Sequence, residues 1–242
     1  MKRFLILTKA IFLIHLRNGA VLFWNFAFPV LLMIIYGVVF SDFMDYMTPG
    51  VITLNLLSFG LVGSSAMLLE MREKGILRRL QATPLPAIQL VGAYLVVNFA
   101  ITLLQSILIL VMGIALYGVT VSVTGLLIAV PMIIAGVFTF LALGGIVSGL
   151  APKAGVATGV GMTIYFILMF ISDMVFPLDM LPGWLQTVVP YLPAYPVAQL
   201  VRSALLDSVL SPDWLTYLAV LAVYALGGTF IAAKLFRWEP KA

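Results

Sequence analysis

Long runs of apolar residues, separated by short polar segments, dominate the sequence. Each run is long enough to cross a hydrocarbon core roughly 30 Å thick as a helix. The apolar residues are continuous and do not alternate with polar ones, as they would in the strands of a membrane β-barrel. The pattern therefore predicts an all-α membrane protein with six transmembrane helices. The predicted spans are residues 20–40, 51–69, 87–117, 125–150, 155–176 and 214–235.

The composition supports this fold class. Of the 242 residues, 63% are hydrophobic and 9% are charged, and the mean hydropathy is +1.18. Soluble domains contain about 25% charged residues, and the exterior of one this size could not hide so much apolar surface. A soluble enzyme is therefore excluded, and residues 1–242 are expected to form a single transmembrane domain.

The charged residues predict the orientation in the membrane. With the N-terminus inside the cell, 12 of the 13 Lys and Arg residues fall in inner segments, and only Arg202 falls outside. Lys and Arg are enriched in the cytoplasmic segments of membrane proteins. We therefore expect both termini to be cytoplasmic, and we attribute the pI of about 9.4 to cytoplasmic segments and not to binding of nucleic acid.

Residues 1–18 precede the first span and are predicted to form an amphipathic helix on the inner membrane surface. Their four basic residues fall within about 120° of a helical wheel. Apolar residues share this arc, so a longer first helix with snorkelling basic side chains is the alternative. The four basic residues are Lys2, Arg3, Lys9 and Arg17.

Residues 70–86 form the most charge-dense stretch of the chain. We predict a short cytosolic helix over residues 71–81, ended by Thr83-Pro84 because a residue before proline avoids the α region. Three apolar residues give this helix an apolar face, flanked by basic residues, and such a helix suits docking of a soluble partner. The apolar residues are Ile76, Leu77 and Leu80, and the basic residues are Arg78 and Arg79.

Residues 177–213 lie outside the cell in the predicted topology, yet they are rich in proline, aliphatic and aromatic residues. A free loop would be more polar. We therefore predict two short re-entrant helices that dip back into the outer leaflet, between the fifth and sixth spans. Such structure requires a backbone whose polar groups are satisfied by protein or by a wet cavity.

Catalytic chemistry finds little support in the sequence. The chain has no Cys, and its single His is His15, on the cytoplasmic side and far from the serines of the apolar spans. Thiol chemistry, His-rich metal sites and an intramembrane serine protease are therefore excluded. No Gly-Lys dipeptide occurs, which excludes a P-loop for ATP.

Ion-coupled transport is the next class to weigh, because it usually places ionisable residues in the membrane. The deep polar residues here are neutral, and interhelical hydrogen bonds are their expected role. Asp173 is the exception, at the outer end of the fifth span: it is either a solvated residue near the interface, with Arg202 as its candidate partner, or an ion or substrate ligand. The neutral residues are Asn25, Asn55, Asn98 and Gln105.

Two Gly-x-x-x-Gly pairs, Gly145–Gly149 and Gly155–Gly159, mark the fourth and fifth spans. This spacing lets two helices approach closely. We expect tight packing at both pairs, within the chain or between subunits.

The segment from Glu70 to Leu85 closely resembles the cytosolic loop of type-2 ABC exporter permeases, which begins Glu-Arg-Glu-x-Gly-Thr and ends with Thr-Pro. It departs from the family pattern at Met71, where Arg is usual, and at Arg78, where Glu is common. The outer segment resembles the re-entrant region of the same family. The matching outer residues are Phe176-Pro177-Leu178, Leu181-Pro182-Gly183-Trp184-Leu185, Leu192-Pro193 and Arg202.

The resemblance implies a non-catalytic permease of the prokaryotic cell (inner) membrane. It implies a homodimer with helices one and five at the interface, and two copies of an ABC ATP-binding subunit that bind ATP and Mg²⁺ and receive the coupling helix. The implied coupling residues are Glu70, Arg72, Glu73, Lys74, Gly75, Ile76, Leu77, Arg78, Arg79, Leu80, Ala82, Thr83 and Pro84. The implied outer re-entrant region contains Asp173, Pro177, Pro182, Trp184, Pro193 and Arg202.

The nearly uncharged membrane region suits an apolar ligand, so the expected substrate is an amphiphile such as a drug, an antibiotic or a lipid. Export of a polysaccharide or another glycan is the alternative. An ion-coupled secondary transporter and a structural scaffold remain as other classes, but neither accounts for the docking face of residues 70–86.

Overall fold

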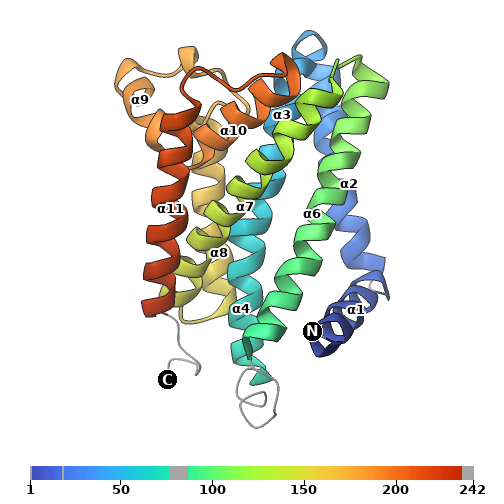
Figure 1. The fold of residues 1–242 in the computed structure, drawn as a ribbon, viewed down its shortest axis with the longest axis vertical. Coiled ribbons are helices and arrows are strands. Elements are labelled where there is room, and N and C mark those ends of the chain that lie inside the picture. Colours follow the sequence, from blue (N-terminus) through green and yellow to red (C-terminus); the bar gives the residue numbers. More distant parts are fainter. Residues whose placement is uncertain (1, 18, 77–86, 236–242) are drawn as a thin grey trace.

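The computed structural model describes residues 2–17, 19–76 and 87–235, and within these ranges it contains helices and no strand (Figure 1). The membrane-sized elements stand side by side in one bundle. They and the first helix are α1 (Lys2–Arg17), α2 (Gly19–Val39), α3 (Met44–Leu57), α4 (Ser64–Glu73), α6 (Ala87–Tyr117), α7 (Val123–Leu150), α8 (Ala154–Ile171) and α11 (Trp214–Leu235).

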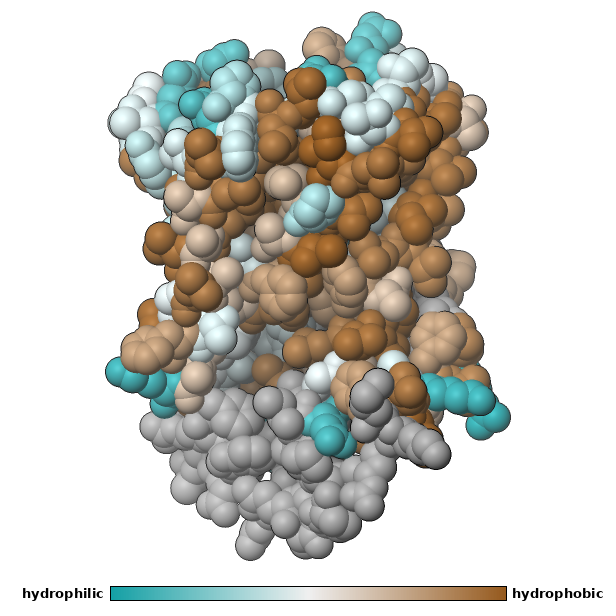
Figure 2. Space-filling view, viewed as in Figure 1, coloured by the Kyte–Doolittle hydropathy of each residue, from teal (hydrophilic) through white to brown (hydrophobic). Residues whose placement is uncertain are grey.

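Five helical runs within the described residues are long and apolar enough to cross a membrane. They are Ser41–Glu73, Gly92–Tyr117, Val123–Leu150, Ala154–Ile171 and Trp214–Leu235. The 21-residue helix α2 is the sixth apolar helix, with a shorter apolar stretch at Phe26–Val39. Figure 2 shows a broad apolar band across the face of the bundle in view, with polar residues gathered toward its two ends. The all-α membrane fold, with five to six membrane-capable helices, is thus confirmed.

The second run is longer than the predicted span 51–69. It begins with the 3-10 helix η1 (Ser41–Phe43), continues through α3, the π-helix η2 (Ser58–Gly63) and α4, and ends at Glu73. The predicted span covers only the uncharged residues 51–69, whereas the helix continues through Pro49 and through charged residues at both ends. Residues 71–73 of the predicted cytosolic helix are therefore the end of this long helical run.

The fifth span is shorter than the predicted range 155–176. Helix α8 ends at Ile171, where the Ser172 N–H donates to the Leu168 carbonyl at 3.0 Å. The next residue, Asp173, has a φ of 59°. A left-handed backbone cannot continue a right-handed helix, so the chain turns at Asp173, which apolarity alone did not predict.

Helix α7 lies at the centre of the bundle and packs against α11, η2, α10, α4 and α3. Its glycines allow close approaches: a Cβ on Gly144 would lie 2.2 Å from the Gly60 carbonyl oxygen of η2. Gly145 and Gly149 face Ala232 and Leu235 of α11, so this pair packs within the chain. In contrast, a Cβ on Gly155 or Gly159 would meet nothing within 4 Å among the described residues.

Helix α1 crosses beside one end of α6, at an angle to α2 (Figure 1). Ile11 is buried against Ala93, Val97 and Ile101 of α6. The two helices are therefore separate, unlike the alternative of one long first helix. Leu5, Ile6 and Ile14 remain exposed, and the location of α1 on the membrane surface remains a prediction.

The segment after α8 folds at the other end of the bundle (Figure 1). Helix α10 is almost completely buried and packs against α3, α7 and α11. Two short α-helices are thus present where two were predicted, and their depth in the outer leaflet remains a prediction. The elements of this segment are η3 (Leu178–Met180), α9 (Gly183–Val188), η4 (Val189–Tyr191), α10 (Ala194–Arg202) and η5 (Ser203–Asp207).

Candidate coupling and translocation sites

The charged end of α4 carries the described part of the predicted coupling segment. Glu70, Arg72 and Glu73 lie in its last two turns, and Lys74 follows as the C-cap. Gly75 comes next with a φ of 65°, and its N–H donates to the Arg72 carbonyl at 3.0 Å. This left-handed glycine ends the helix in the way that is common at helix C-termini. The prediction of one continuous helix over residues 71–81 is therefore wrong, because the helix breaks at Gly75.

Glu70 and Lys74 form an ion pair one turn apart on α4. The Lys74 ammonium donates to a Glu70 carboxylate oxygen at 2.5 Å, and both side chains are more than half exposed. The hydrogen bond to Glu70 and the charge of its carboxylate raise the pKa of the Lys74 amine above its ordinary value. An exposed pair of this kind adds little stability, but it keeps both side chains on the solvent-facing side of the helix end.

Glu73 makes a different contact. Its carboxylate accepts a hydrogen bond at 2.7 Å from the backbone N–H of Ala154, the first residue of α8. Arg72, beside it, is 4% exposed and therefore lies inside the helix packing. The two charged neighbours thus differ: Glu73 reaches across to α8, and Arg72 is buried.

Ile76 is half-buried and is the last described residue of the predicted segment. The remaining predicted coupling residues lie outside the described residues. They are Leu77, Arg78, Arg79, Leu80, Ala82, Thr83 and Pro84.

At the opposite end of the bundle, Asp173 forms a buried polar cluster with side chains from α3 and α10. Its carboxylate accepts from the Arg202 guanidinium at 2.5 Å, from the Tyr46 hydroxyl at 2.7 Å and from the Gln199 side-chain amide. It also accepts from the Leu178 backbone N–H at 2.7 Å. Asp173 is therefore paired with Arg202, its candidate partner. Only 5% of its surface is exposed, so it is buried and not solvated.

Arg202 makes two further contacts in this cluster. It donates to the Asp173 backbone carbonyl at 2.6 Å, and its guanidinium lies 3.8 Å from the centre of the Tyr46 ring. Stacking on an aromatic face is favourable for a guanidinium. Sequence reasoning missed Tyr46 and Gln199, because nothing along the chain indicates that residues so far from Asp173 meet it.

The other outer residues singled out by sequence lie apart from this carboxylate. Pro177, Pro182 and Pro193 each occupy the N-cap position of a short helix, η3, α9 and α10 respectively. A proline fixes its own φ and favours an extended residue before it. These prolines therefore separate the short helices of the segment. Trp184 is 69% exposed on α9.

A pocket with a volume of about 280 Å³ lies between α2, α3, α6 and α8, in the apolar part of the bundle. Apolar side chains predominate in its lining, three uncharged polar side chains join them, and no lining residue among those described is charged. The lining residues are Phe28, Pro29, Leu32, Val51, Leu54, Asn55, Ser58, Gln105, Met162 and Tyr165.

The polar residues of this pocket are held by neighbouring helices. The Asn55 side-chain amide donates to the Thr102 carbonyl of α6 at 3.2 Å and lies 3.4 Å from the Ser106 hydroxyl. Gln105 is 7% exposed. The interhelical hydrogen bond predicted for Asn55 is therefore present, and the same residue faces the pocket.

Comparison with known proteins identifies the family. The sequence profile of the family described as "ABC-2 type transporter" matches residues 2–206. The chain belongs to the ABC-2 type transporter family. The family makes the chain a membrane permease component of an ABC transporter.

Two relatives of this ABC-2 chain differ in how much of their own length the chain covers. It is 25% identical over 222 residues to the putative transport permease YvfS of Bacillus subtilis (strain 168), covering 87% of this chain and 88% of that protein. It is also 25% identical over 192 residues to ABC transporter G family member 20 of Dictyostelium discoideum. That match covers 78% of this chain but only 26% of the relative, so the chain spans about a quarter of its length.

The π-helix η2 of this ABC-2 chain has no obvious signal in the sequence. It begins at Ser58, which lines the pocket, and Gly60 within it packs against α7, where a Cβ would lie 2.3 Å from the Phe140 Cβ. π-Helical turns inside α-helices are frequent at functional sites. Small residues at 58, 60 and 63 were the available hint, but glycine is common in membrane helices in any case.

Proposed function

We propose that this chain is the permease subunit of an ATP-driven exporter that moves an amphiphilic substrate, such as a drug, an antibiotic or a lipid, from the cytoplasmic side outward. The observation that carries this proposal is the pocket between α2, α3, α6 and α8. Its lining is mainly apolar, with amide and hydroxyl groups from Asn55, Gln105 and Ser58. Sites with mostly apolar walls and a few polar groups suit ligands that are partly apolar.

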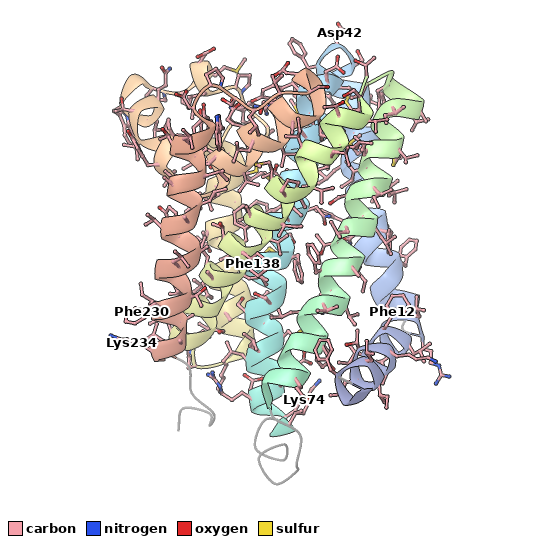
Figure 3. The ribbon with its side chains drawn as sticks, in the orientation of Figure 1. Phe12, Asp42, Lys74, Phe138, Phe230 and Lys234 are labelled. Carbon is pink, nitrogen blue, oxygen red and sulfur yellow. The ribbon has the colours of Figure 1, made fainter. Side chains whose placement is uncertain are left out.

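The two ends of the bundle support the proposed orientation. Figure 3 shows Asp42 at one end and Lys74 and Lys234 at the other. The end of α4 and both ends of the described chain share the basic side (Figure 1). Since basic residues collect on the cytoplasmic side, the termini and the coupling segment are cytoplasmic in our proposal, and the membrane is the prokaryotic cell (inner) membrane.

In our proposal, two permease copies form the transporter and two ATP-binding subunits attach on the cytoplasmic side. Residues 70–86 act as the coupling element, α1 also touches the ATPase, and ATP and Mg²⁺ bind to the ATPase subunits. The exposed glycines of α8, Gly155 and Gly159, support a dimer through this helix, because small residues allow a second helix to approach closely.

The structure gives reasons to rank the other classes lower. Both Asp173 carboxylate oxygens accept hydrogen bonds from within the chain, which leaves this group poorly suited to bind a coupling ion. The apolar pocket favours an amphiphile over a glycan, whose hydroxyl groups need many polar partners. Glycan export is thus the second candidate among ABC exporters.

Co-expression with a cognate ATP-binding subunit tests the proposal. We expect the two chains to co-purify and the permease to change the ATP hydrolysis rate of its partner. As a matched variant, Leu77→Asp/Leu80→Asp is expected to leave membrane insertion intact and to separate hydrolysis from transport. Failure of the wild-type pair to associate, with hydrolysis unaffected by the permease, would reject the proposal.

A further inference from the structure

The contact between Glu73 and Ala154 joins two elements that the chain does not connect directly. Glu73 is the last residue of α4, and Ala154 is the first residue of α8, after a short link that follows α7. We propose that Glu73 is a positioning residue that transmits motion of the coupling segment directly to the start of α8. This inference rests on the proposed function and goes beyond it, by assigning a route from the coupling segment to a pocket-lining helix.

The hydrogen bond occupies a position where a helix needs an acceptor. The first N–H groups of a helix have no partner within it. Lys153, the N-cap of α8, is extended, with φ −140° and ψ 156°, and its side chain makes no capping hydrogen bond. Glu73 therefore supplies from α4 a cap that α8 lacks, and its negative charge suits the positive end of the helix dipole.

The elements on either side of this hydrogen bond can carry a displacement. The coupling segment continues from Glu73 through the left-handed residue Gly75. Helix α8 packs against η2 and α4, and a Cβ on Gly161 would lie 3.4 Å from the Val62 Cα. Further along α8, Met162 and Tyr165 line the pocket. A shift of the start of α8 is thus a shift of one pocket wall.

Glu70 provides a matched control on the same helix. It is acidic, exposed and three residues earlier, but its carboxylate pairs with Lys74 at the end of the same helix. A role for negative charge at the ATPase surface would involve both glutamates. A role in holding α8 involves Glu73 and not Glu70.

The donor can be removed as cleanly as the acceptor. Ala154 occupies the first helical position, where proline is favoured because its missing N–H has no intrahelical partner. Lys153 already has the extended backbone that proline requires of its predecessor. Ala154→Pro therefore deletes the N–H that Glu73 accepts and leaves the helix otherwise intact.

The test uses the full permease with its ATPase subunit in proteoliposomes, and it measures permease-dependent ATP hydrolysis. We expect Glu73→Ala and Ala154→Pro each to lower this activity about fivefold, the ratio equivalent to the ~1 kcal/mol of a typical helix N-cap. The double variant should be no worse than either single variant, because both remove one interaction. Glu73→Gln, which keeps an acceptor oxygen, should retain most of the activity. Glu70→Ala, which leaves the Ala154 hydrogen bond in place, should leave amide hydrogen exchange at the start of α8 as in wild type.

A second measurement separates transmission from simple stability. Amide hydrogen exchange over residues 155–160 should change between the nucleotide-free complex and the complex trapped with MgATP and vanadate, and the two single variants should abolish this change. Loss of activity in Glu73→Ala with normal activity in Ala154→Pro would overturn the inference, and so would normal activity in both. If wild-type permease itself does not alter hydrolysis, the proposed function fails first, which is a distinct result.

Discussion

Asp173 and Arg202 form an ion pair of 2.5 Å with side chains that are only 6% and 12% exposed. The pair joins the left-handed turn after α8 to the last residue of α10. Tyr46 of α3 completes the contact, through its hydroxyl on Asp173 and its ring under Arg202. One buried carboxylate thus holds three parts of the fold together at one end of the bundle.

Removal of Arg202 should destabilise the protein strongly. Breaking a buried ion pair leaves an uncompensated charge, which typically costs ~3–5 kcal/mol. We expect Arg202→Ala to lower the thermal unfolding midpoint in detergent and the yield of folded protein. The double variant Asp173→Asn/Arg202→Gln should recover part of the loss, since no lone charge remains. Equal stability of Arg202→Ala and wild type would show that the cluster does not hold the fold.

The left-handed conformation of Gly75, at the end of the bundle opposite to Asp173, gives a test of the coupling segment. Gly75→Pro removes the N–H bonded to Arg72 and imposes a φ near −65° where the structure has 65°. We expect permease-stimulated ATP hydrolysis to fall by more than about tenfold, since the strain exceeds about 1.4 kcal/mol. Gly75→Asn is the control, because asparagine tolerates the left-handed region. Comparable losses in both variants would contradict this account of the turn.

Filling the pocket should impair substrate handling without unfolding the protein. Met162 lines the pocket and is 40% exposed, so Met162→Trp can place an indole ring into the free volume. We expect stimulation of ATP hydrolysis by an added amphiphile to disappear, while the hydrolysis rate without substrate stays within about twofold. Ile167→Trp is the matched control on α8, exposed and outside the pocket lining. Equal effects of both tryptophans would argue against a substrate site at Met162.

The glycine contacts make a prediction about folding alone. A methyl group on Gly144 would collide with the backbone oxygen of Gly60, whereas one on Gly159 meets nothing within 4 Å among the described residues. Gly144→Ala should therefore destabilise the protein by about 1–3 kcal/mol, as overpacking does, and Gly159→Ala should not. Thermal unfolding of the two variants side by side decides this, and a stable Gly144→Ala protein would show that the α7–η2 contact is loose.

Much of the bundle could be predicted from apolar length. Helix α6 ends at Tyr117 and α11 begins at Trp214, in agreement with the predicted bounds 117 and 214, because the apolar runs end and begin at these residues. Residues 41–50 and 70–73 belong to the second helical run although they carry charges. The helix continues there because its backbone hydrogen bonds do not depend on apolar side chains. A hydropathy pattern therefore does not predict where such a helix ends.

The candidate sites were predictable only where their residues are close in sequence. The end of α4 was found because Glu70, Glu73 and Lys74 are clustered along the chain. The partner of Glu73 in α8 and the partners of Asp173 in α3 and α10 come from distant segments. Such contacts depend on how helices pack, and one sequence contains no local pattern for them.

ATP-dependent uptake of a fluorescent amphiphile into inverted membrane vesicles tests the central claim most directly. We predict uptake only when this permease, its ATPase subunit and MgATP are all present, with loss of uptake in Gly75→Pro and retention in Gly75→Asn. Uptake that persists without the ATPase and follows an ion gradient, or the absence of any ATP-dependent uptake across amphiphiles of differing charge, would contradict the account.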